Sequence, residues 1–446
     1  MGIYHFIAIG GIGMSGLAKY LLEDGHSVSG SDIADSKYIS ALKELGAKVT
    51  IGHNAENVPD GATVIVSTAI RDNNPELLRA KELGLKIYHR SDMLKEIAEQ
   101  AQGVNKTFIG FSGTHGKTTT SGLCSYVLDK AGLEPSFVDG GIVPDIHTNA
   151  QHKSGKYFVA ELDESDGTIV KYNPDILVIN NLEEDHLDFY KNGMSDIIKT
   201  FNMAISHSKK VLVNNDNSGV NQLSGNFITY GLNNADYTAK NIEYSKEGTT
   251  FDIYKRGELL TAIRIQLSGV HNVYNTLAVV SALAEAGVNI SDIKDCFYGF
   301  TGMGRRFQKV CDLNGIEVYD DYAHHPTEIK ATLNSAALKF GKEHIVAVFQ
   351  PHRYTRLQAL WNEFKNAFDE AGRVIVTDVY AASEDKIEGI TGERFASDIN
   401  SEFIGGDMKS VAKSLLPTLK KGDIVIGLGA GTITALGKEL ENLELV

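Results

Sequence analysis

The stretch Lys106–Leu123 constrains the chain most, because it places a buried strand, a glycine-containing turn and a helix in the order of a phosphate-binding loop. The apolar run Thr107–Phe111 has the length of a buried strand, and a helix is expected from about Thr118 to Leu128. Backbone N–H groups at such a turn bind an anion, and the helix dipole adds to the attraction.

The residues of this turn indicate a nucleotide site. Lys117 is expected to reach the β- and γ-phosphates, and the Thr118 hydroxyl to bind Mg²⁺. The strict pattern G-x-x-x-x-G-K-[ST] is not matched, because Phe111 stands where the first glycine belongs, and Gly113 supplies flexibility from inside the loop instead. The alternative, a glycine-rich turn with one solvated lysine, is disfavoured by the flanking strand and helix. The sequence therefore predicts that the chain binds ATP.

Length and charge restrict the class of protein. The 446 residues suggest roughly three domains. The net charge of −14, without a block of lysine and arginine, argues against nucleic acid or an anionic membrane as a partner. The cysteines are few and scattered, and no stretch approaches the ~18 apolar residues of a membrane span. We expect a soluble cytoplasmic protein.

The N-terminal segment carries a second candidate site. A strand at His5–Ile9 precedes the pattern Gly11-x-Gly13-x-x-Gly16, which is the dinucleotide fingerprint in its strand–turn–helix context. The next strand ends at Asp32, where an acidic residue would meet a ribose or a base. The fingerprint alone indicates only that a diphosphate lies on that helix, and the alternative is a tight turn that needs glycines.

Further strands are expected at Thr63–Ser67 and Leu85–Tyr88, and Gln100–Asn105 is predicted to be a linker. Open α/β sheets bind ligands at the carboxyl ends of their strands, so the loops after these strands belong to the same candidate site.

The second domain places acidic residues after buried strands. Glu161 directly follows the apolar run Tyr157–Ala160, and Asp185-His186 follow the strand Asp175–Ile179. Since Mg²⁺ needs only one or two protein carboxylates besides phosphate and water, Glu161 is a candidate ligand, and His186 a second-metal or orienting residue. The alternatives are solvated loop charges and a structural histidine.

A helix is predicted at Val270–Ala286, after antiparallel strands over residues 236–267. Asn272 and Asn275 lie on one face of this helix, where two amides could read a purine edge, although exposed asparagine is equally common.

A glycine-rich joint, Thr301–Gly304, precedes Arg306, which is placed to reach a phosphate across a cleft. Beyond it strands and helices alternate again. One strand end carries His324-His325, and another carries His352 with two arginines, Arg353 and Arg356. The arginine pair would hold a carboxylate bidentately; the alternative is a solvated, basic helix start.

Taken together, these motifs resemble the Mur ligases over essentially the whole chain. The resemblance rests on the fingerprint, Gly113-Thr114-His115-Gly116-Lys117-Thr118-Thr119, Glu161, Asp185-His186, His271-Asn272-x-x-Asn275, Gly304-Arg305-Arg306-Phe307, Asp320-Asp321-Tyr322-Ala323-His324-His325-Pro326-Thr327-Glu328 and Gln350-Pro351-His352-Arg353-Tyr354-Thr355-Arg356. The stretch Tyr380–Glu384 departs from the pattern expected of the family, so no role is assigned to it.

The resemblance implies a role for each matching residue. It assigns a UDP-sugar to Gly11, Gly13, Met14, Ser15, Asp32, Thr68, His89, Arg90, Asn149, Ser165 and Asp166. It assigns ATP to Gly113, Thr114, His115, Gly116, Lys117, Thr118, Thr119, Asn272, Asn275, Arg306 and Asp321, and Mg²⁺ to Thr118, Glu161 and His186. It assigns the amino acid to His325, His352, Arg353 and Arg356, and catalysis to Lys117, Glu161, His186, Arg306 and His325.

The resemblance also implies a fold and a reaction. The fold is α/β, with a Rossmann-like UDP-binding domain (1–104), a central ATPase domain with a mostly parallel sheet (105–312) and a Rossmann-like C-terminal domain (313–446). The reaction is the ATP-dependent joining of L-alanine to the lactyl carboxylate of UDP-N-acetylmuramate through an acyl phosphate, in peptidoglycan synthesis, by a monomer or homodimer.

Three alternatives remain open at this stage. A sister ligase would attach a preformed peptide to the same sugar nucleotide in cell-wall recycling. A nicotinamide-dependent oxidoreductase would use the fingerprint but leave Lys117 without a task. A nucleotide-dependent switch would use the phosphate loop but not the histidines and arginines of the third domain.

Overall fold

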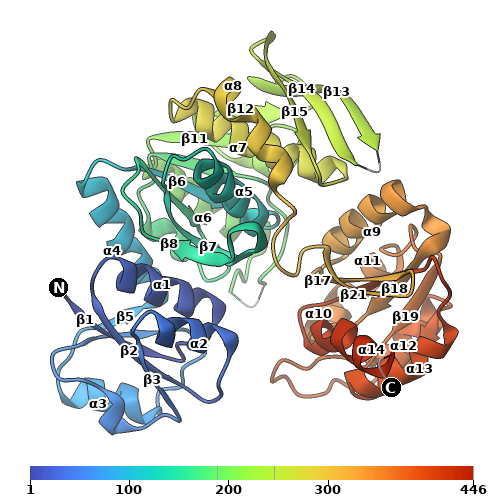
Figure 1. Cartoon of the computed structure of the whole chain (residues 1–446), viewed down its shortest axis with the longest axis horizontal. Coiled ribbons are helices and arrows are strands. Elements are labelled where there is room, and N and C mark those ends of the chain that lie inside the picture. The colour runs from blue at the N-terminus through green and yellow to red at the C-terminus, as the bar shows by residue number, and fades with distance from the viewer. Residues whose placement is uncertain (188, 246, 445–446) are drawn as a thin grey trace. The chain divides into compact units, whose positions relative to one another are not determined.

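The computed structural model describes residues 1–187, 189–245 and 247–444. The chain divides into two compact units. The first comprises Met1–Lys240, Asp252–Ile263 and Tyr274–Phe300, and the second Asn241–Phe251, Arg264–Val273 and Thr301–Val446. Their α/β architecture, with mostly parallel sheets, confirms the predicted fold class (Figure 1).

The N-terminal domain is a five-stranded parallel sheet in the order β3-β2-β1-β4-β5, with its helices packed on it (Figure 1). This is the strand order of a Rossmann-type sheet, with the switch point between β1 and β4. The elements are β1 (Ile3–Ile7), α1 (Ile12–Glu23), β2 (Ser27–Asp32), α2 (Lys37–Glu44), β3 (Lys48–Ile51), β4 (Thr63–Val66), α3 (Pro75–Glu82), β5 (Ile87–His89) and α4 (Arg90–Gly103).

Two expectations for this domain need correction. The strand β3 was not predicted, because it lies at the sheet edge and is mostly exposed, so it lacks a run of buried apolar residues. The linker predicted at Gln100–Asn105 is wrong over its first part, since α4 continues to Gly103. Ala98 and Ala101 are buried on the inner face of that helix, which extends the apolar stripe into the polar stretch.

The central domain is built on a ten-stranded sheet in the order β15-β14-β13-β12-β11-β10-β6-β9-β7-β8. The strand β6 that leads into the phosphate loop lies between β10 and β9 and is parallel to both. The elements are β6 (Thr107–Ser112), α5 (Lys117–Lys130), β7 (Ser136–Val143), β8 (Thr148–Gln151), β9 (Tyr157–Glu161), β10 (Ile176–Ile179), α6 (Met194–Ser206), β11 (Lys210–Asn214), β12 (Ile228–Gly231), β13 (Tyr237–Ser245), β14 (Gly248–Lys255), β15 (Glu258–Ile265), α7 (Val270–Glu285) and α8 (Ile290–Ile293).

The C-terminal domain is a six-stranded sheet in the order β16-β17-β21-β18-β19-β20, parallel except for β16. Its elements are β16 (Gln308–Leu313), β17 (Ile316–Asp321), α9 (Pro326–Phe340), β18 (Ile345–Phe349), α10 (Tyr354–Ala359), α11 (Trp361–Lys365), β19 (Arg373–Val376), α12 (Gly392–Asp398), β20 (Glu402–Phe403), α13 (Met408–Leu415), β21 (Ile424–Leu428) and α14 (Leu436–Glu444). The antiparallel edge strand β16 crosses the boundary predicted between residues 312 and 313. None of the described helices is long and apolar enough to cross a membrane.

The N-terminal and central domains share a continuous apolar core within the first unit. Helix α1 packs against β7 and β8, and the ring of Tyr20 meets that of Phe158 edge-on at 6.0 Å between centroids. Lys19 Nζ donates to the backbone carbonyl of Ala150 at 2.7 Å. The sheet that carries the fingerprint is therefore held firmly against the sheet that carries the phosphate loop.

A buried carboxylate organises the N-terminal sheet. Asn74 caps α3 and Pro75 takes its first position, which places Glu76 at the buried start of the helix with 0% of it exposed. Its oxygens accept from Ser31 Oγ at 2.6 Å, Asn57 Nδ2 at 2.6 Å and the Asn54 N–H at 3.1 Å. Burial alone would raise the pKa of Glu76, but the hydrogen bond with His5 Nε2 at 3.3 Å and the three bonds above lower it.

We expect Glu76→Ala to lower stability by about 3 kcal/mol, because it removes a buried charge whose polar partners then lose their acceptor. The matched control is Glu82→Ala on the same helix, where the carboxylate is exposed and pairs with Arg79 at 3.4 Å, a contact worth little. Thermal unfolding of the two variants should show a clear drop in midpoint for Glu76→Ala alone. Equal shifts would contradict the assignment.

Candidate active site

The phosphate loop lies between β6 and α5, as predicted, and its glycines are required by its shape. Gly113 has φ +126°, and a Cβ there would lie 2.8 Å from the carbonyl oxygen of Asn181. Gly116 has φ +81°, and a Cβ there would lie 2.9 Å from Asn275 Oδ1. Both positions combine a left-handed backbone with close neighbours, so only glycine fits.

Two asparagines, for which the sequence indicated no role, hold the phosphate loop in place through hydrogen bonds. The Asn181 carbonyl accepts from the Thr114 N–H at 3.0 Å, and its Oδ1 accepts from the His115 N–H at 2.7 Å. Asn180 Nδ2 donates to Thr120 Oγ1 at 3.1 Å. Both asparagines directly follow β10, the neighbour of β6. Amides immediately after a buried strand were the signal that could have revealed them.

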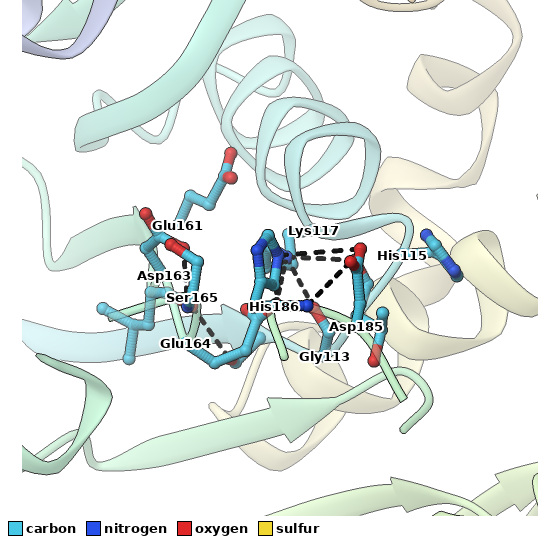
Figure 2. Close-up of polar contacts among 12 residues, drawn as sticks. Gly113, His115, Lys117, Glu161, Asp163, Glu164, Ser165, Asp185 and His186 are labelled. Carbon is cyan, nitrogen blue, oxygen red and sulfur yellow. Dashed lines mark hydrogen bonds and ion pairs between the residues drawn. The ribbon is translucent and has the colours of Figure 1, made fainter. Parts of the chain in front are cut away.

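Lys117 is folded back onto its own loop. Its Nζ donates to the carbonyls of Gly113 at 2.7 Å and Thr114 at 3.1 Å, and to Glu164 Oε1 at 2.9 Å (Figure 2). Only 13% of the Lys117 side chain is exposed. Burial alone would lower the pKa of Lys117, but the charges of Glu164 and Asp163 raise it, so the amine is protonated at neutral pH. This is a buried cation at the start of a helix, where a phosphate would also bind.

The loop after β9 connects this lysine to the N-terminal domain. Asp163 accepts from Arg90 Nη2 at 2.6 Å and from the Ser165 N–H at 3.0 Å. Burial would raise the pKa of Asp163, but the charges of Lys117 and Arg90 hold it well below its usual range. Beside Arg90, His89 caps α4. The carboxylate of Asp163 thus interacts both with Arg90, which is assigned to the UDP-sugar, and with the charge of Lys117, which is assigned to ATP.

The residues assigned to the metal lie around the same loop. Thr118 is in the first turn of α5, and Thr119 follows it. Glu161 ends β9, where its Oε2 accepts from the Gly140 N–H at 3.1 Å. His186 Nε2 lies 3.7 Å from Asp185 Oδ2 and 4.0 Å from Glu164 Oε1 (Figure 2). A hydroxyl and a carboxylate beside a phosphate loop form a donor set that suits Mg²⁺.

The fingerprint residues are arranged to offer backbone groups to a ligand. Gly11 precedes α1, and a Cβ on Gly13 would meet nothing within 4 Å, so the glycine leaves open space there. Met14 is buried in the apolar core, and Ser15 is buried with its hydroxyl donating to the Ile12 carbonyl at 3.0 Å. Asp32 Oδ2 accepts from the Gly10 N–H at 2.8 Å and so fixes the loop.

The other residues assigned to the UDP-sugar differ from one another in their burial and in their hydrogen bonds. Asn149 is buried and donates to the Ile12 carbonyl at 2.7 Å, which ties β8 to α1. Asp166 Oδ1 accepts from Thr168 Oγ1 at 2.6 Å, within the same loop as Ser165. Thr68 lies just after β4, at the ligand edge of the sheet. Asn149 and Asp166 therefore have structural contacts of their own.

The two asparagines of α7, Asn272 and Asn275, belong to different units. Asn275 belongs to the first unit and lies against Gly116 of the phosphate loop. Asn272 belongs to the second unit, where its Nδ2 donates to the Ser268 carbonyl at 2.8 Å.

The C-terminal domain gathers a cluster of aromatic and basic residues at the ends of β17 and β18. The ring of His352 stacks on Tyr380 with centroids 5.5 Å apart, and lies 5.7 Å from that of His324. Arg356 Nη1 lies 3.1 Å from His352 Nδ1. Burial lowers the pKa of both histidines to about 4, so they are neutral at pH 7.

Arg353 lies in the same cluster with φ +68°, and its N–H donates to the Tyr380 carbonyl at 2.8 Å. Its Nε is buried without a hydrogen-bond partner among the described residues. An orphaned guanidinium donor of this kind suits an anionic ligand. Tyr380, from the stretch left without a role, is therefore part of the cluster, as is His324.

Three other residues of this domain support their neighbours. His325 caps α9 in a capping box with Glu328, and Pro326 takes the first helical position as predicted. Arg306 Nη1 pairs with Glu328 Oε1 at 3.2 Å. Asp321 is buried, and its oxygens accept from the N–H groups of Phe307 and Ala323. The carboxylate assigned to the ATP ribose thus binds its own chain in this structure.

The sequence did not predict the buried acid Asp139, whose carboxyl is affected by the charge of the metal-binding candidate Glu161. Asp139 on β7 is 1% exposed, and neither carboxylate oxygen accepts a hydrogen bond from the described residues. Burial, with a smaller contribution from the charge of Glu161, raises the pKa of Asp139 to about 8. The carboxyl is therefore mostly protonated at neutral pH.

We expect Asp139→Asn to raise the thermal midpoint, by an amount that depends on pH. In the unfolded chain the carboxyl ionises near pH 4, whereas the folded protein keeps its proton until about pH 8. The wild type thus loses stability between pH 4 and 8, and the amide does not. The difference should be small at pH 4 and exceed about 1 kcal/mol at pH 8. Asp60→Asn, on an exposed loop, is the matched control; a difference independent of pH would refute the prediction.

Comparison with known proteins agrees with this geometry. Residues 3–102 match the Mur ligase family, catalytic domain; residues 111–283 match the Mur ligase middle domain; and residues 305–431 match the Mur ligase, glutamate ligase domain. The UDP-N-acetylmuramate–L-alanine ligase of Geotalea daltonii is 42% identical over 98% of this chain and 96% of its own. That of Pelobacter propionicus is 41% identical over 98% and 97%.

A solved structure supports the same conclusion. The UDP-N-acetylmuramate-alanine ligase of Thermotoga maritima superposes with a TM-score of 0.86, at 28% identity, over 100% of this chain and 99% of its own. The resemblance inferred from the motifs is thereby confirmed, and the chain belongs to the Mur ligase family.

Proposed function

We propose that this protein is an ATP-dependent ligase that joins L-alanine to the lactyl carboxylate of UDP-N-acetylmuramate, a step of peptidoglycan synthesis. The observation that carries the proposal is the similarity, at about 40% identity and over almost the full length of both chains, to ligases with this activity in their names. We expect the enzyme to act in the cytoplasm.

The N-terminal domain would hold the sugar nucleotide. The diphosphate would lie at the start of α1, on backbone N–H groups that the open space at Gly13 makes accessible. Asp32, which fixes this loop, lies at the end of β2, where a ribose or base is expected. Arg90 is the positive charge at the same edge of the sheet and faces the central domain through Asp163.

The central domain would hold ATP, with its terminal phosphates at Lys117 and its adenine toward Asn275. Thr118 and Glu161 would bind Mg²⁺, with His186 near them, and the ion would neutralise charge on the phosphates. The family resemblance assigns Arg306 to the phosphates and Asp321 to the ribose.

The C-terminal cluster would hold the carboxylate of L-alanine. Arg353 offers a buried Nε that has no hydrogen-bond partner among the described residues, and Arg356 Nη1 lies 3.1 Å from His352 Nδ1. Because His352 and His324 are neutral, the arginines supply the positive charge of the cluster.

The chemistry asks mainly for positioning and for neutralisation of charge. The lactyl carboxylate would attack the γ-phosphate to give an acyl phosphate, and the amine of alanine would then attack the acyl carbon, with phosphate leaving. Lys117 would stabilise the charge that develops on the transferred phosphate, since it is buried and protonated.

The test is phosphate release from ATP and Mg²⁺ with UDP-N-acetylmuramate, in the presence of no amine, L-alanine or a cell-wall tripeptide. Release that requires L-alanine, with a product heavier by one alanine residue, is the expected result. Release with the tripeptide alone would assign the protein to the recycling ligases. No release in any arm would refute the proposal.

Arg353→Lys should raise the KM for L-alanine by about tenfold or more, because lysine cannot form the bidentate contact with a carboxylate. The KM for ATP should change little. Arg394→Lys is the matched control: this arginine lies in the same domain and donates to the Gly389 carbonyl, away from the cluster. A rise in the KM for ATP and alanine alike would show that Arg353 does not serve the amino acid.

A further inference from the structure

The contact between Lys117 and Glu164 restricts how a phosphate can bind to Lys117. Both carboxylate oxygens of Glu164 lie 2.9 Å from Lys117 Nζ, and only 4% of the Glu164 side chain is exposed (Figure 2). An ammonium group has three N–H donors. Here they serve Gly113, Thr114 and Glu164. A phosphate that binds Lys117 must therefore replace one of these acceptors.

Glu164 is the acceptor that a phosphate replaces most readily. The carbonyls of Gly113 and Thr114 belong to the loop backbone, which Asn181 holds in place. The Glu164 side chain instead has rotatable bonds. Burial raises the pKa of Glu164 to about 7 although the charge of Lys117 lowers it, and in its ionised form it offers negative charge to the ammonium, as a phosphate oxygen does. The imidazole of His186 lies 4.0 Å from Glu164 Oε1 and could receive the carboxylate after it leaves Lys117.

The backbone of Glu164 is fixed, so the side chain returns to the same place. Its carbonyl accepts from the Gly167 N–H at 2.9 Å and from the Tyr190 hydroxyl. The preceding residue, Asp163, is held by Arg90. The side chain is thus the movable part of an otherwise anchored residue.

We propose that Glu164 is a positioning residue that competes with the terminal phosphates of the nucleotide for Lys117. In the nucleotide-free enzyme it holds the lysine in place. ATP displaces the carboxylate, and the carboxylate recaptures the lysine when the transferred phosphate has left, which favours release of ADP. The inference rests on the proposed ATP site and adds a residue that sets the affinity of that site.

The test compares the wild type with Glu164→Gln, which keeps the size of the side chain and one acceptor but removes its charge. Titration calorimetry with Mg²⁺ measures the Kd of a non-hydrolysable ATP analogue and of AMP, which lacks the two terminal phosphates proposed to bind Lys117. The variant should bind the ATP analogue about tenfold more tightly, because no ion pair has to break. Its Kd for AMP should stay within about twofold of the wild type.

Three further variants separate the direct contact with Lys117 from the general electrostatic effect of charges in this loop. Asp163→Asn removes a charge from the same loop but not from contact with Lys117 Nζ, and should tighten analogue binding much less. In a Lys117→Met background, Glu164→Gln should have no effect on the analogue. Glu164→Asp keeps the charge but shortens the side chain, and should give an intermediate Kd.

Unchanged or weaker binding of the ATP analogue by Glu164→Gln would overturn the inference while leaving the ATP site intact. Equal tightening for AMP would also overturn it, because the effect would then not pass through Lys117. Absence of nucleotide binding by the wild type itself would refute the proposed function, and with it this inference.

Discussion

The burial of one ammonium group, that of Lys117, is the interaction on which the arrangement of the central domain depends. A lysine held at the start of α5 needs acceptors on every side, and the chain supplies two loop carbonyls and a carboxylate. Those carbonyls face inward only because Gly113 adopts a conformation closed to other residues and because Asn181 fixes the turn. The loop thus holds the ammonium group at the start of the helix.

The same charge connects the central domain with the N-terminal sheet. Asp163 lies between Lys117 and Arg90, and both cations keep it ionised. The loop after β9 therefore interacts with residues of two candidate sites that belong to different domains, through the single carboxylate of Asp163. Continuous apolar packing between α1 and the central sheet makes this electrostatic link rigid.

Much of the fold followed from local patterns. Apolar runs such as Thr107–Phe111 predicted the buried strands to within two residues, because a strand covered on both faces needs uninterrupted apolar side chains. The misses at β3, at β16 and at the end of α4 share a cause. The edge strands β3 and β16 are largely exposed, and the end of α4 is polar apart from Ala101, so tertiary neighbours rather than local pattern stabilise these segments.

The sequence by itself determined the family, the α/β architecture and the residue types of each candidate site, since motifs such as Gly116-Lys117-Thr118 require particular side chains at fixed spacing. Only the tertiary structure decided which partners those side chains have. Glu164, Asn180 and Asn181 are distant from Lys117 in the chain and resemble ordinary loop residues. Their roles arise because parallel strands bring their carboxyl ends to one edge of the sheet, where burial makes each charge depend on its neighbours.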